Sequence, residues 1–289
     1  MERVVDAQFT ADWIRTLSER VAGSTNQVVN EEHPILSASL PTGERFQCVL
    51  PPAAPAGGAI SIRKQVIHDI GLDVYKSRGA FDDTRVGRQL RLSPAEETLA
   101  AMLQGDVDVM EFLRAAVRSR VSIAVSGGTS TGKSTFLNAL LKEVPDEERI
   151  VTIEDTRELR PRTPNTVALL ASKGDQGRAK VTPQQLLEAS LRMRPDRVML
   201  GELRGEEAFS FLQAINTGHP GSLTTVHANS ARDAYDRLAL MVMQSGVRLQ
   251  KHEIIDYLKE VIPVVVQLHR FPDGRRVVSE IVFTKGDVL

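Results

Sequence analysis

From about residue 120 onward, the apolar positions alternate between short β-branched runs and longer runs with helical spacing. The short runs predict strands, and apolar residues three and four positions apart predict amphipathic helices. Regular alternation of the two favours an α/β fold, with a mostly parallel sheet covered by helices. Strands are expected at 122–126, 149–154, 167–171, 197–200 and 222–226, and helices at 135–141, 183–193, 206–216 and 231–244.

The end of the chain carries a different pattern. A helical run at 253–260 is followed by two β runs, 264–270 and 277–283, with Pro272-Asp273-Gly274 between them. A turn of this composition between two strands predicts an antiparallel hairpin. We expect this hairpin at the edge of the sheet.

The first 90 residues have the pattern of a separate and smaller unit. A helical run at 9–21 comes first, and the Pro- and Gly-rich stretch at 51–58 cannot pair inside a sheet, so it is expected to be a loop. The sequence therefore predicts a small mixed α/β domain. Its strands are expected at 35–40, 45–50 and 59–64.

Residues 70–92 carry mixed charge, spaced glycines and little periodic apolar content, which suits a linker or hinge. Ser93 and Glu96 around Pro94 then predict a capped helix start, with helices to about residue 104 and at 107–119. We place the domain boundary near residue 90. The expected domains are 1–90 and 91–289.

Composition narrows the classes of function. The 289 residues include 36 Lys and Arg against 37 Asp and Glu, so no bulk positive charge favours non-specific binding of nucleic acid. Cys48 is the single cysteine, which excludes an intramolecular disulfide, suits a reducing compartment and predicts a packing residue. The longest apolar run, 261–266, is short and contains Pro263, and no signal-peptide pattern is found. We expect a cytosolic chain whose membrane contact is peripheral.

One stretch carries most of the chemical information. Gly127-Gly128-Thr129-Ser130-Thr131-Gly132-Lys133-Ser134 fits the phosphate-loop pattern G-x-x-x-x-G-K-[ST] between a predicted strand and a predicted helix. In such a loop, backbone N–H groups converge on phosphate oxygens, the lysine neutralises terminal phosphate charge and the last hydroxyl reaches Mg²⁺. A flexible Ser/Gly/Thr loop would match only by accident. The segment through Thr135 is therefore predicted to bind a nucleotide.

Polar residues directly follow three other predicted strands: Glu154, Glu202 and His227. Ligands of parallel α/β sheets lie at the carboxyl ends of the strands. Hydrolysis of a phosphoanhydride needs a metal ion, an oriented water and stabilised charge, and two carboxylates could divide the first two tasks. The alternative for Glu154 and Glu202 is that each only decorates a helix N-terminus, where acidic residues are common. His227 could be a solvated histidine, or its neutral imidazole could contact the terminal phosphate.

Four segments together resemble the secretion and pilus ATPase superfamily. Residues 127–134, 152–159, 191–205 and 218–229 look like its Walker A, Asp, Walker B and His boxes, in the family's order. The short N-terminal half and the Thr-Ile-Glu-Asp-Thr-Arg-Glu-Leu form of 152–159 resemble the VirB11/TrbB branch of type IV secretion. Type II secretion ATPases of the superfamily often carry a four-cysteine zinc module, which a single cysteine cannot form.

The resemblance implies an ATPase that assembles as a homohexamer, with a PAS-like N-terminal domain, a RecA-like C-terminal domain and ATP with Mg²⁺ between them. It also implies work at the cytoplasmic face of the inner membrane, with the membrane components of a type IV secretion system, in pilus biogenesis or substrate transfer. By matching position, Lys133 and Ser134 hold phosphate and magnesium. Glu154 matches the acid of the Asp box, Glu202 the Walker B acid and metal residue, and His227 the His-box residue.

In this family, arginines from the N-terminal domain reach the terminal phosphate, and Arg45 and Arg63 match those places best. A solvated strand arginine is the alternative for each. Arg192 and Arg204 lie inside the boxes and could instead be subunit-interface or salt-bridge residues. Three other functions stay open: a pilus extension, retraction or type II secretion motor of the superfamily, a nucleotide-gated assembly platform, and a ring that translocates nucleic acid, which the near-neutral charge disfavours.

Overall fold

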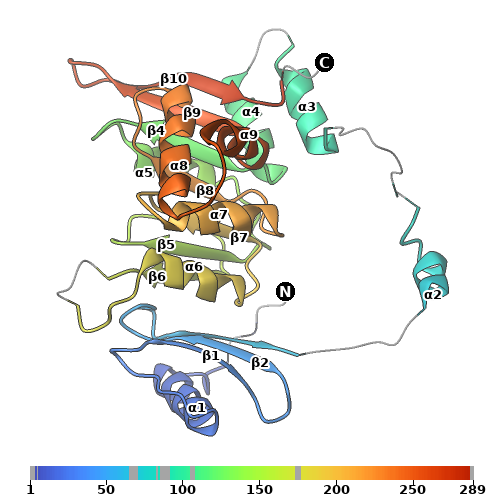
Figure 1. Cartoon of the computed structure of the whole chain (residues 1–289), viewed down its shortest axis with the longest axis vertical. Helices are drawn as coiled ribbons and strands as arrows, with labels where there is room; N and C mark the ends of the chain where they lie inside the picture. Colours follow the sequence, from blue (N-terminus) through green and yellow to red (C-terminus); the bar gives the residue numbers. More distant parts are fainter. Residues whose placement is uncertain are drawn as a thin grey trace.

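The computed structural model describes residues 4, 6–64, 71–82, 84, 92–104, 108–172 and 177–286. Within these residues the chain forms a three-stranded and a seven-stranded sheet, both accompanied by helices (Figure 1). The predicted α/β class, with a small unit before a larger one, is confirmed.

The N-terminal unit consists of one helix on an antiparallel sheet. Its strands follow one another in the order β1-β2-β3, and both neighbouring pairs are antiparallel. A short apolar core between helix and sheet holds the unit together. The elements are α1 (Ala11–Ser24), β1 (Ile35–Ser39), β2 (Arg45–Val49) and β3 (Ala59–Arg63).

Two side chains of this unit illustrate how α1 packs on the sheet. Trp13 shares helical spacing with the buried Val21, yet it is 37% exposed and packs edge-to-face on Phe9, with ring centroids 4.7 Å apart. Cys48 is fully buried and accepts a hydrogen bond from the Ser18 hydroxyl at 3.0 Å. Burial raises the pKa of Cys48 to about 11, so its thiol stays protonated at neutral pH. The predicted packing role of Cys48 is confirmed.

The larger sheet has the strand order β10-β9-β4-β8-β7-β5-β6. Every neighbouring pair is parallel except β9 and β10, which form the predicted antiparallel hairpin at one edge. The strands are β4 (Ile123–Gly127), β5 (Ile150–Glu154), β6 (Thr166–Leu170), β7 (Arg197–Leu200), β8 (Leu223–Val226), β9 (Val264–Arg270) and β10 (Arg276–Phe283).

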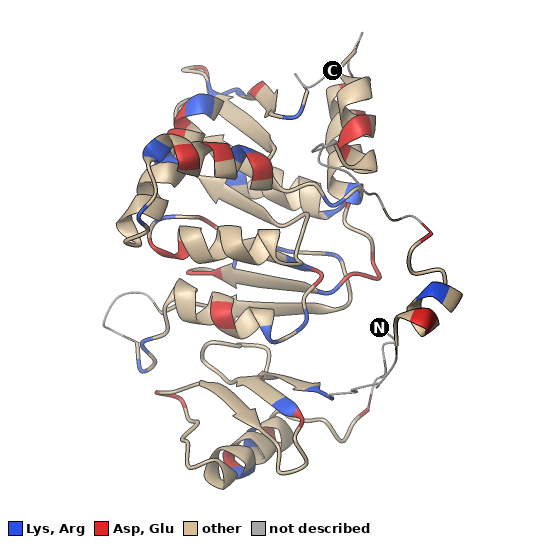
Figure 2. Cartoon of the chain, turned by 45° about the vertical axis from the view of Figure 1, so that its right-hand side comes forward, with Lys and Arg blue, Asp and Glu red and all other residues tan. Residues whose placement is uncertain are grey.

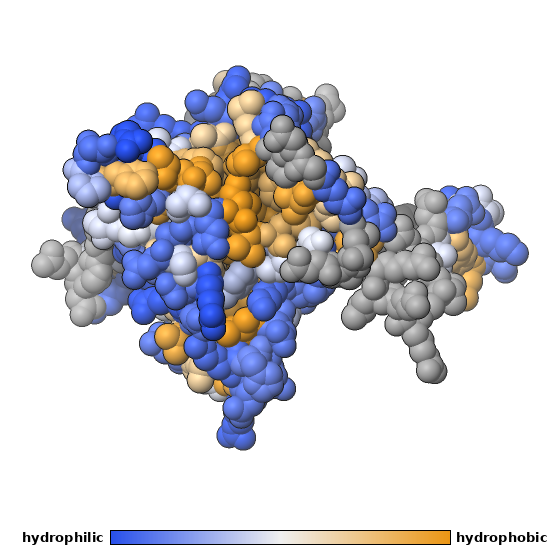
Figure 3. Space-filling model, turned by 90° about the horizontal axis from the view of Figure 1, so that it is seen from above, coloured by the Kyte–Doolittle hydropathy of each residue, from blue (hydrophilic) through white to orange (hydrophobic). Residues whose placement is uncertain are grey.

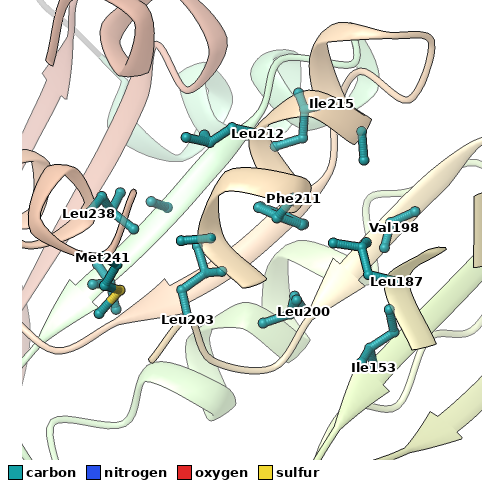
Figure 4. Packing of buried hydrophobic residues seen from close by; sticks show 14 of the residues in the cluster. Ile153, Leu187, Val198, Leu200, Leu203, Phe211, Leu212, Ile215, Leu238 and Met241 are labelled. Atoms are coloured by element: carbon teal, nitrogen blue, oxygen red, sulfur yellow. The ribbon is translucent and has the colours of Figure 1, made fainter. Parts of the chain in front are cut away.

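Helices cover both faces of this sheet and bury two cores. Because successive strand residues point to opposite faces, Met199 enters one core while Val198 and Leu200 enter the other, where they meet Leu187 and Phe211 (Figure 4). The first core lies under α3 (Pro94–Met102), α4 (Val109–Arg118) and α5 (Lys133–Leu141). The second lies under α6 (Pro183–Leu191), α7 (Glu207–Asn216), α8 (Ala231–Gln244) and α9 (Lys251–Val261).

The N-terminal unit is packed against the β6 edge of the larger sheet (Figure 1). The predicted loop at 51–58 crosses this edge, and the Leu170 N–H donates to the Ala53 carbonyl at 2.8 Å. Val49, Ala53 and Ala54 are buried in the same core as α6 and α7. The loop therefore covers backbone groups that an exposed edge strand would leave unpaired.

The connection between the units is described only in part. It contains the short helix α2 (Leu72–Ser77), which has no buried residue and stands away from the body of the molecule (Figures 1 and 3). Residues 65–70, 83 and 85–91 lie outside the described residues, and with them lie most of the predicted hinge and the predicted boundary near residue 90. The capping box of Ser93 and Glu96 at the start of α3 is present as predicted.

Surface charge is mixed. Acidic and basic residues are both spread over the side shown in Figure 2, and neither sign dominates it. Seen from above, apolar residues gather in the middle of the face and hydrophilic residues surround them (Figure 3). Among the described residues, no helix has the length and apolar content needed to cross a bilayer.

Candidate nucleotide site

Four neighbouring strands bring the predicted residues to one edge of the sheet. In the order β4, β8, β7 and β5, their carboxyl ends lead into the phosphate loop, His227, Glu202 and Glu154. All four line one cleft of about 480 Å³, together with Thr129, Ser130, Gly132, Lys133, Ser134 and Thr135. The topology therefore places Glu154, Glu202 and His227 around a common space with the phosphate loop.

Sharp backbone turns shape the phosphate loop. Gly132 has φ +94°, a left-handed conformation that glycine adopts without steric cost, directly before α5 begins at Lys133. A side chain at Gly127 would meet the Thr131 hydroxyl at 2.5 Å and the Leu268 carbonyl at 3.0 Å. Both glycines are therefore required by the close path of the loop between β4 and α5. The positive end of α5 then faces the cleft.

Lys133 is the buried cation of the site. Its ammonium donates to the Gly127 and Gly128 carbonyls at 2.9 and 3.0 Å and lies within 3.4 Å of the His227 ring nitrogens. Burial lowers the pKa of Lys133, and the Glu202 carboxylate partly opposes the shift. The loop carbonyls thus hold the ammonium at the place where phosphate charge is expected.

Glu202 lies between His227 and Arg204. One of its oxygens lies 3.2 Å from His227 Nε2, and the other accepts from Arg204 at 2.6 Å. Burial lowers the pKa of His227, and the nearby Lys133 charge lowers it further. A neutral imidazole that donates its Nε2 proton to Glu202 can accept from Lys133 at Nδ1, so it links the phosphate loop to the β7 strand end.

Arg204 also reaches the end of β5. Its second terminal nitrogen donates to Asp155 at 2.6 Å, so the guanidinium bridges the carboxylates of Glu202 and Asp155. The hydrogen bond to Glu202 raises the pKa of Arg204. Of the two roles left open for Arg204, the structure shows the salt bridge.

Glu154 is buried and held from one side. Its Oε1 accepts the backbone N–H groups of Glu158 and Leu159, both at 2.8 Å. Its Oε2 is buried and has no hydrogen-bond partner in the described part of the chain. Burial raises the pKa of Glu154 above its ordinary value. A fixed carboxylate with one uncommitted oxygen is suited to accept a proton or orient a water.

These donors fit a magnesium ion. The Ser134 hydroxyl and the Glu202 carboxylate line the cleft and are hard oxygen ligands. Mg²⁺ usually takes one or two protein carboxylates together with substrate phosphates and waters, so it needs no cage of protein ligands. The described residues contain no group of three or more His, Cys, Asp or Glu side chains that could hold a metal ion.

Arg45 and Arg63 do not line this cleft. They lie opposite each other on β2 and β3, where they line a second cavity of about 750 Å³ together with Arg192 and Ser37. Arg192 donates to the Ser37 hydroxyl at 3.1 Å, which joins the end of α6 to β1. Within one chain, the structure therefore separates the predicted arginines from the phosphate loop.

Sequence reasoning did not single out two further residues of the site: Asp155, which lies within the 152–159 segment, and Arg276. Asp155 follows Glu154 and gains its partner Arg204 only through the fold. Arg276, at the start of β10, donates to the Ser130 carbonyl at 3.1 Å across 146 residues of sequence. A prediction of the hairpin's place in the sheet, next to β4, would have been needed to find this contact.

The comparisons with known proteins decide the family. Residues 13–276 match the family model described as "Type II/IV secretion system protein". The chain belongs to this family. Among curated relatives, it is 38% identical over 287 residues to "Type IV secretion system protein VirB11" of Bartonella quintana, which covers 94% of this chain and 80% of that protein. The relative of the same description from Brucella suis biovar 1 is 40% identical over 260 residues, 88% of this chain and 72% of the relative.

A solved structure agrees with these relatives. The crystal structure of the VirB11 ATPase from the Brucella suis type IV secretion system, in complex with sulphate, superposes with a TM-score of 0.90 at 35% identity. The match covers all of this chain and 88% of that one. The resemblance of this chain to the VirB11 branch is thereby confirmed, together with the two-unit α/β fold.

Proposed function

We propose that this chain hydrolyses ATP and uses the energy to power pilus biogenesis or substrate transfer by a type IV secretion system. The observation that carries the proposal is the single cleft in which Lys133, Glu154, Glu202 and His227 surround the phosphate loop. The membership of the chain in the secretion family and its relatives named VirB11 support the transport role.

Each residue has a distinct task in the proposed reaction. Lys133 exchanges its loop carbonyls for phosphate oxygens, and the N–H groups at the start of α5 bind the same charge. Ser134 and Glu202 would hold Mg²⁺, which neutralises phosphate charge when it is bound. Glu154 orients the attacking water through its free oxygen, and His227 senses the terminal phosphate through its contact with Lys133.

Glu154→Gln is expected to lower turnover about 100-fold or more, because the amide cannot accept a proton as a carboxylate does. The variant should be at least as stable as wild type at pH 7. Burial raises the pKa of Glu154 in the folded chain, so its ionisation lowers the free energy of unfolding as the pH rises through that raised value. ATPase rates and thermal melts between pH 4.5 and 7.5 test both statements.

Glu147→Gln is the matched control for this variant, since Glu147 is exposed and does not line the cleft. It should keep wild-type turnover. Normal turnover of Glu154→Gln, or a marked loss of stability at pH 7, would contradict the role given to Glu154.

The N-terminal arginines suggest how the site is completed. Arg45, Arg63 and Arg192 face a cavity whose lining includes hydroxyl and amide groups and no carboxylate, a composition suited to an anion. This cavity shares no lining residue with the phosphate-loop cleft. We therefore propose that its arginines contact the terminal phosphate of the ATP bound to a neighbouring subunit. If every subunit contributes its arginines to the site of a neighbour, the subunits must form a closed ring. The ring that we propose is a homohexamer.

Arg63→Ala is expected to lower turnover about 100-fold or more and to change ATP affinity much less. A guanidinium at the terminal phosphate stabilises charge that develops in the transition state, so its loss acts on turnover first. Steady-state ATPase rates and nucleotide titrations measure the two effects. Lys64→Ala, at the next exposed position of the chain, should behave as wild type. Equal turnover in Arg63→Ala and wild type would remove Arg63 from the site.

The mass of the assembly, with and without ATP and magnesium, tests the proposed ring. A hexamer that forms or tightens with nucleotide is the expected result, and a monomer that turns over ATP at full rate would contradict it. In the cell, we propose that the ring works at the cytoplasmic face of the inner membrane, in peripheral contact with the membrane components of the secretion system. The near-neutral net charge of the chain disfavours a nucleic-acid cargo.

A further inference from the structure

The β9–β10 hairpin contacts the phosphate loop at Ser130–Gly132, which we call the crest of the loop. Arg276, the first residue of β10, donates from Nε to the Ser130 carbonyl at 3.1 Å. The stem of the same side chain lies over Gly132, since a Cβ built there would meet Arg276 Cδ at 3.3 Å. A single arginine therefore contacts two positions of the loop, one through its head and one through its stem.

The backbone conformation of the loop is one that such a contact would stabilise. Ser130 has φ 61° and Gly132 has φ 94°, so two of three successive positions are left-handed. Glycine adopts this conformation freely, but serine does so only when surrounding contacts favour it. The hydrogen bond that Arg276 donates to the Ser130 carbonyl is a contact of this kind. Without it, the crest of the loop would be freer to leave the shape that receives phosphates.

The position of Arg276 is fixed by strand pairing. Arg276 pairs with Arg270 across the hairpin, and in β9 Leu268 pairs with Gly127 at the end of β4. Strand β9 therefore pairs both with the strand that leads into the phosphate loop and with the strand that begins at Arg276. The terminal nitrogens of Arg276 have no hydrogen-bond partner in the described part of the chain, and the side chain is exposed.

We propose that Arg276 is a positioning residue for the nucleotide, which keeps the crest of the phosphate loop in the shape that binds a nucleoside di- or triphosphate. The proposal rests on the proposed function of this loop. ADP and ATP both place phosphates on the loop, so Arg276 should support the binding of both. It lies on the opposite side of the loop from Glu154, and its effect should fall on binding instead of the chemical step.

The test compares three variants in the full chain. Arg276→Ala should weaken binding of Mg-ADP about tenfold, the size expected for the loss of one hydrogen bond from a charged group, and raise the KM for ATP in parallel. Its kcat should stay within about twofold of wild type. Arg276→Lys retains a cationic donor and should recover part of the affinity.

Arg275→Ala is the matched control. Arg275 is the neighbouring residue of the same turn, but its guanidinium is engaged with Asp273 at 2.6 Å and with the Phe271 ring at 5.0 Å. Its removal should leave nucleotide affinity unchanged, although it alters the turn as much as the other variant does. Fluorescence titration with a labelled ADP reports affinity without turnover, and thermal melts report folding.

Wild-type affinity for Mg-ADP in Arg276→Ala would overturn the proposal, as would a fall in kcat with KM unchanged. Equal weakening in Arg275→Ala and Arg276→Ala would also overturn it, because the effect would then belong to the turn. If Arg276→Ala does not fold, Arg276→Lys decides through its intermediate affinity or through a wild-type value that refutes the role. Failure of the wild-type chain to bind any nucleotide would instead overturn the proposed function.

Discussion

Replacing Glu202 with glutamine is expected to stop steady ATP turnover while nucleotide binding is retained. The substitution keeps the size of the side chain and a carbonyl that can accept from Arg204, but it removes the charge beside Lys133 and His227. Since this charge would hold magnesium and acts on the transferred phosphoryl group, turnover should fall about 100-fold or more. Phosphate release and labelled-nucleotide titration measure the two quantities on the same preparation.

The same variant separates a motor from a nucleotide-gated platform. If hydrolysis drives transport, secretion should be lost together with turnover in cells that carry Glu202→Gln. Glu206→Gln, an exposed acid four residues further on, should keep both activities. Unaffected secretion in Glu202→Gln would contradict the motor and leave nucleotide-dependent switching as the working step.

Replacing Arg197 with methionine is expected to cost about 3–5 kcal/mol of the free energy of unfolding, the usual loss when one partner of a buried ion pair is removed. Arg197 is fully buried and forms a two-point contact with Glu148, whose side chain is 7% exposed. It also donates to the Val117 carbonyl at 2.8 Å, so it joins the end of α4 to the start of β7. Methionine leaves Glu148 buried, with Arg120 at 3.2 Å as its remaining cationic partner among the described residues.

Urea unfolding of a small set of variants tests this value. Replacing both partners, as in Glu148→Leu with Arg197→Met, should recover part of the loss, because no buried charge is left without a partner. Arg118→Ala breaks a more exposed pair with Glu143 and should cost about 1 kcal/mol or less. A loss below about 1 kcal/mol in the single variant would show that the buried pair contributes little to stability.

The sequence was sufficient to predict the sheet and most of the cleft because both depend on short-range patterns. Each buried strand is a short apolar run, and Glu154, Glu202 and His227 directly follow such runs. Once their strands lie beside β4, the carboxyl ends must meet at one edge. The order β4-β8-β7-β5 therefore explains why three separate motifs line one space, while the chemical role of each residue stays a prediction.

The features that could not be predicted depend on how distant elements pack. Arg276 reaches Ser130 because the hairpin continues the sheet beside β4, and no local pattern marks that arginine. The loop around Ala53 is rich in proline and glycine like many exposed loops, yet it covers β6 and fills the main core. The six-residue helix α2 is too short for apolar periodicity to indicate it.

The placement of Arg63 was the least accessible to sequence reasoning. Its position on β3 follows from the strand pattern, but whether it reaches the phosphate loop depends on how the N-terminal unit is packed. In this chain the unit lies on the β6 edge, and Arg63 faces a cavity separate from the cleft. The central claim of the proposed mechanism is therefore that one ATP site is built from two subunits.

Mixing two inactive variants tests this claim most directly. Lys133→Ala subunits lack a working phosphate loop, and Arg63→Ala subunits lack the arginine, so each preparation alone should have little ATPase activity. If the site is shared, mixed rings contain interfaces where an intact Lys133 faces an intact Arg63, and a large fraction of the activity should return on mixing. Failure to recover activity in rings shown by mass to contain both variants would contradict a site shared between subunits.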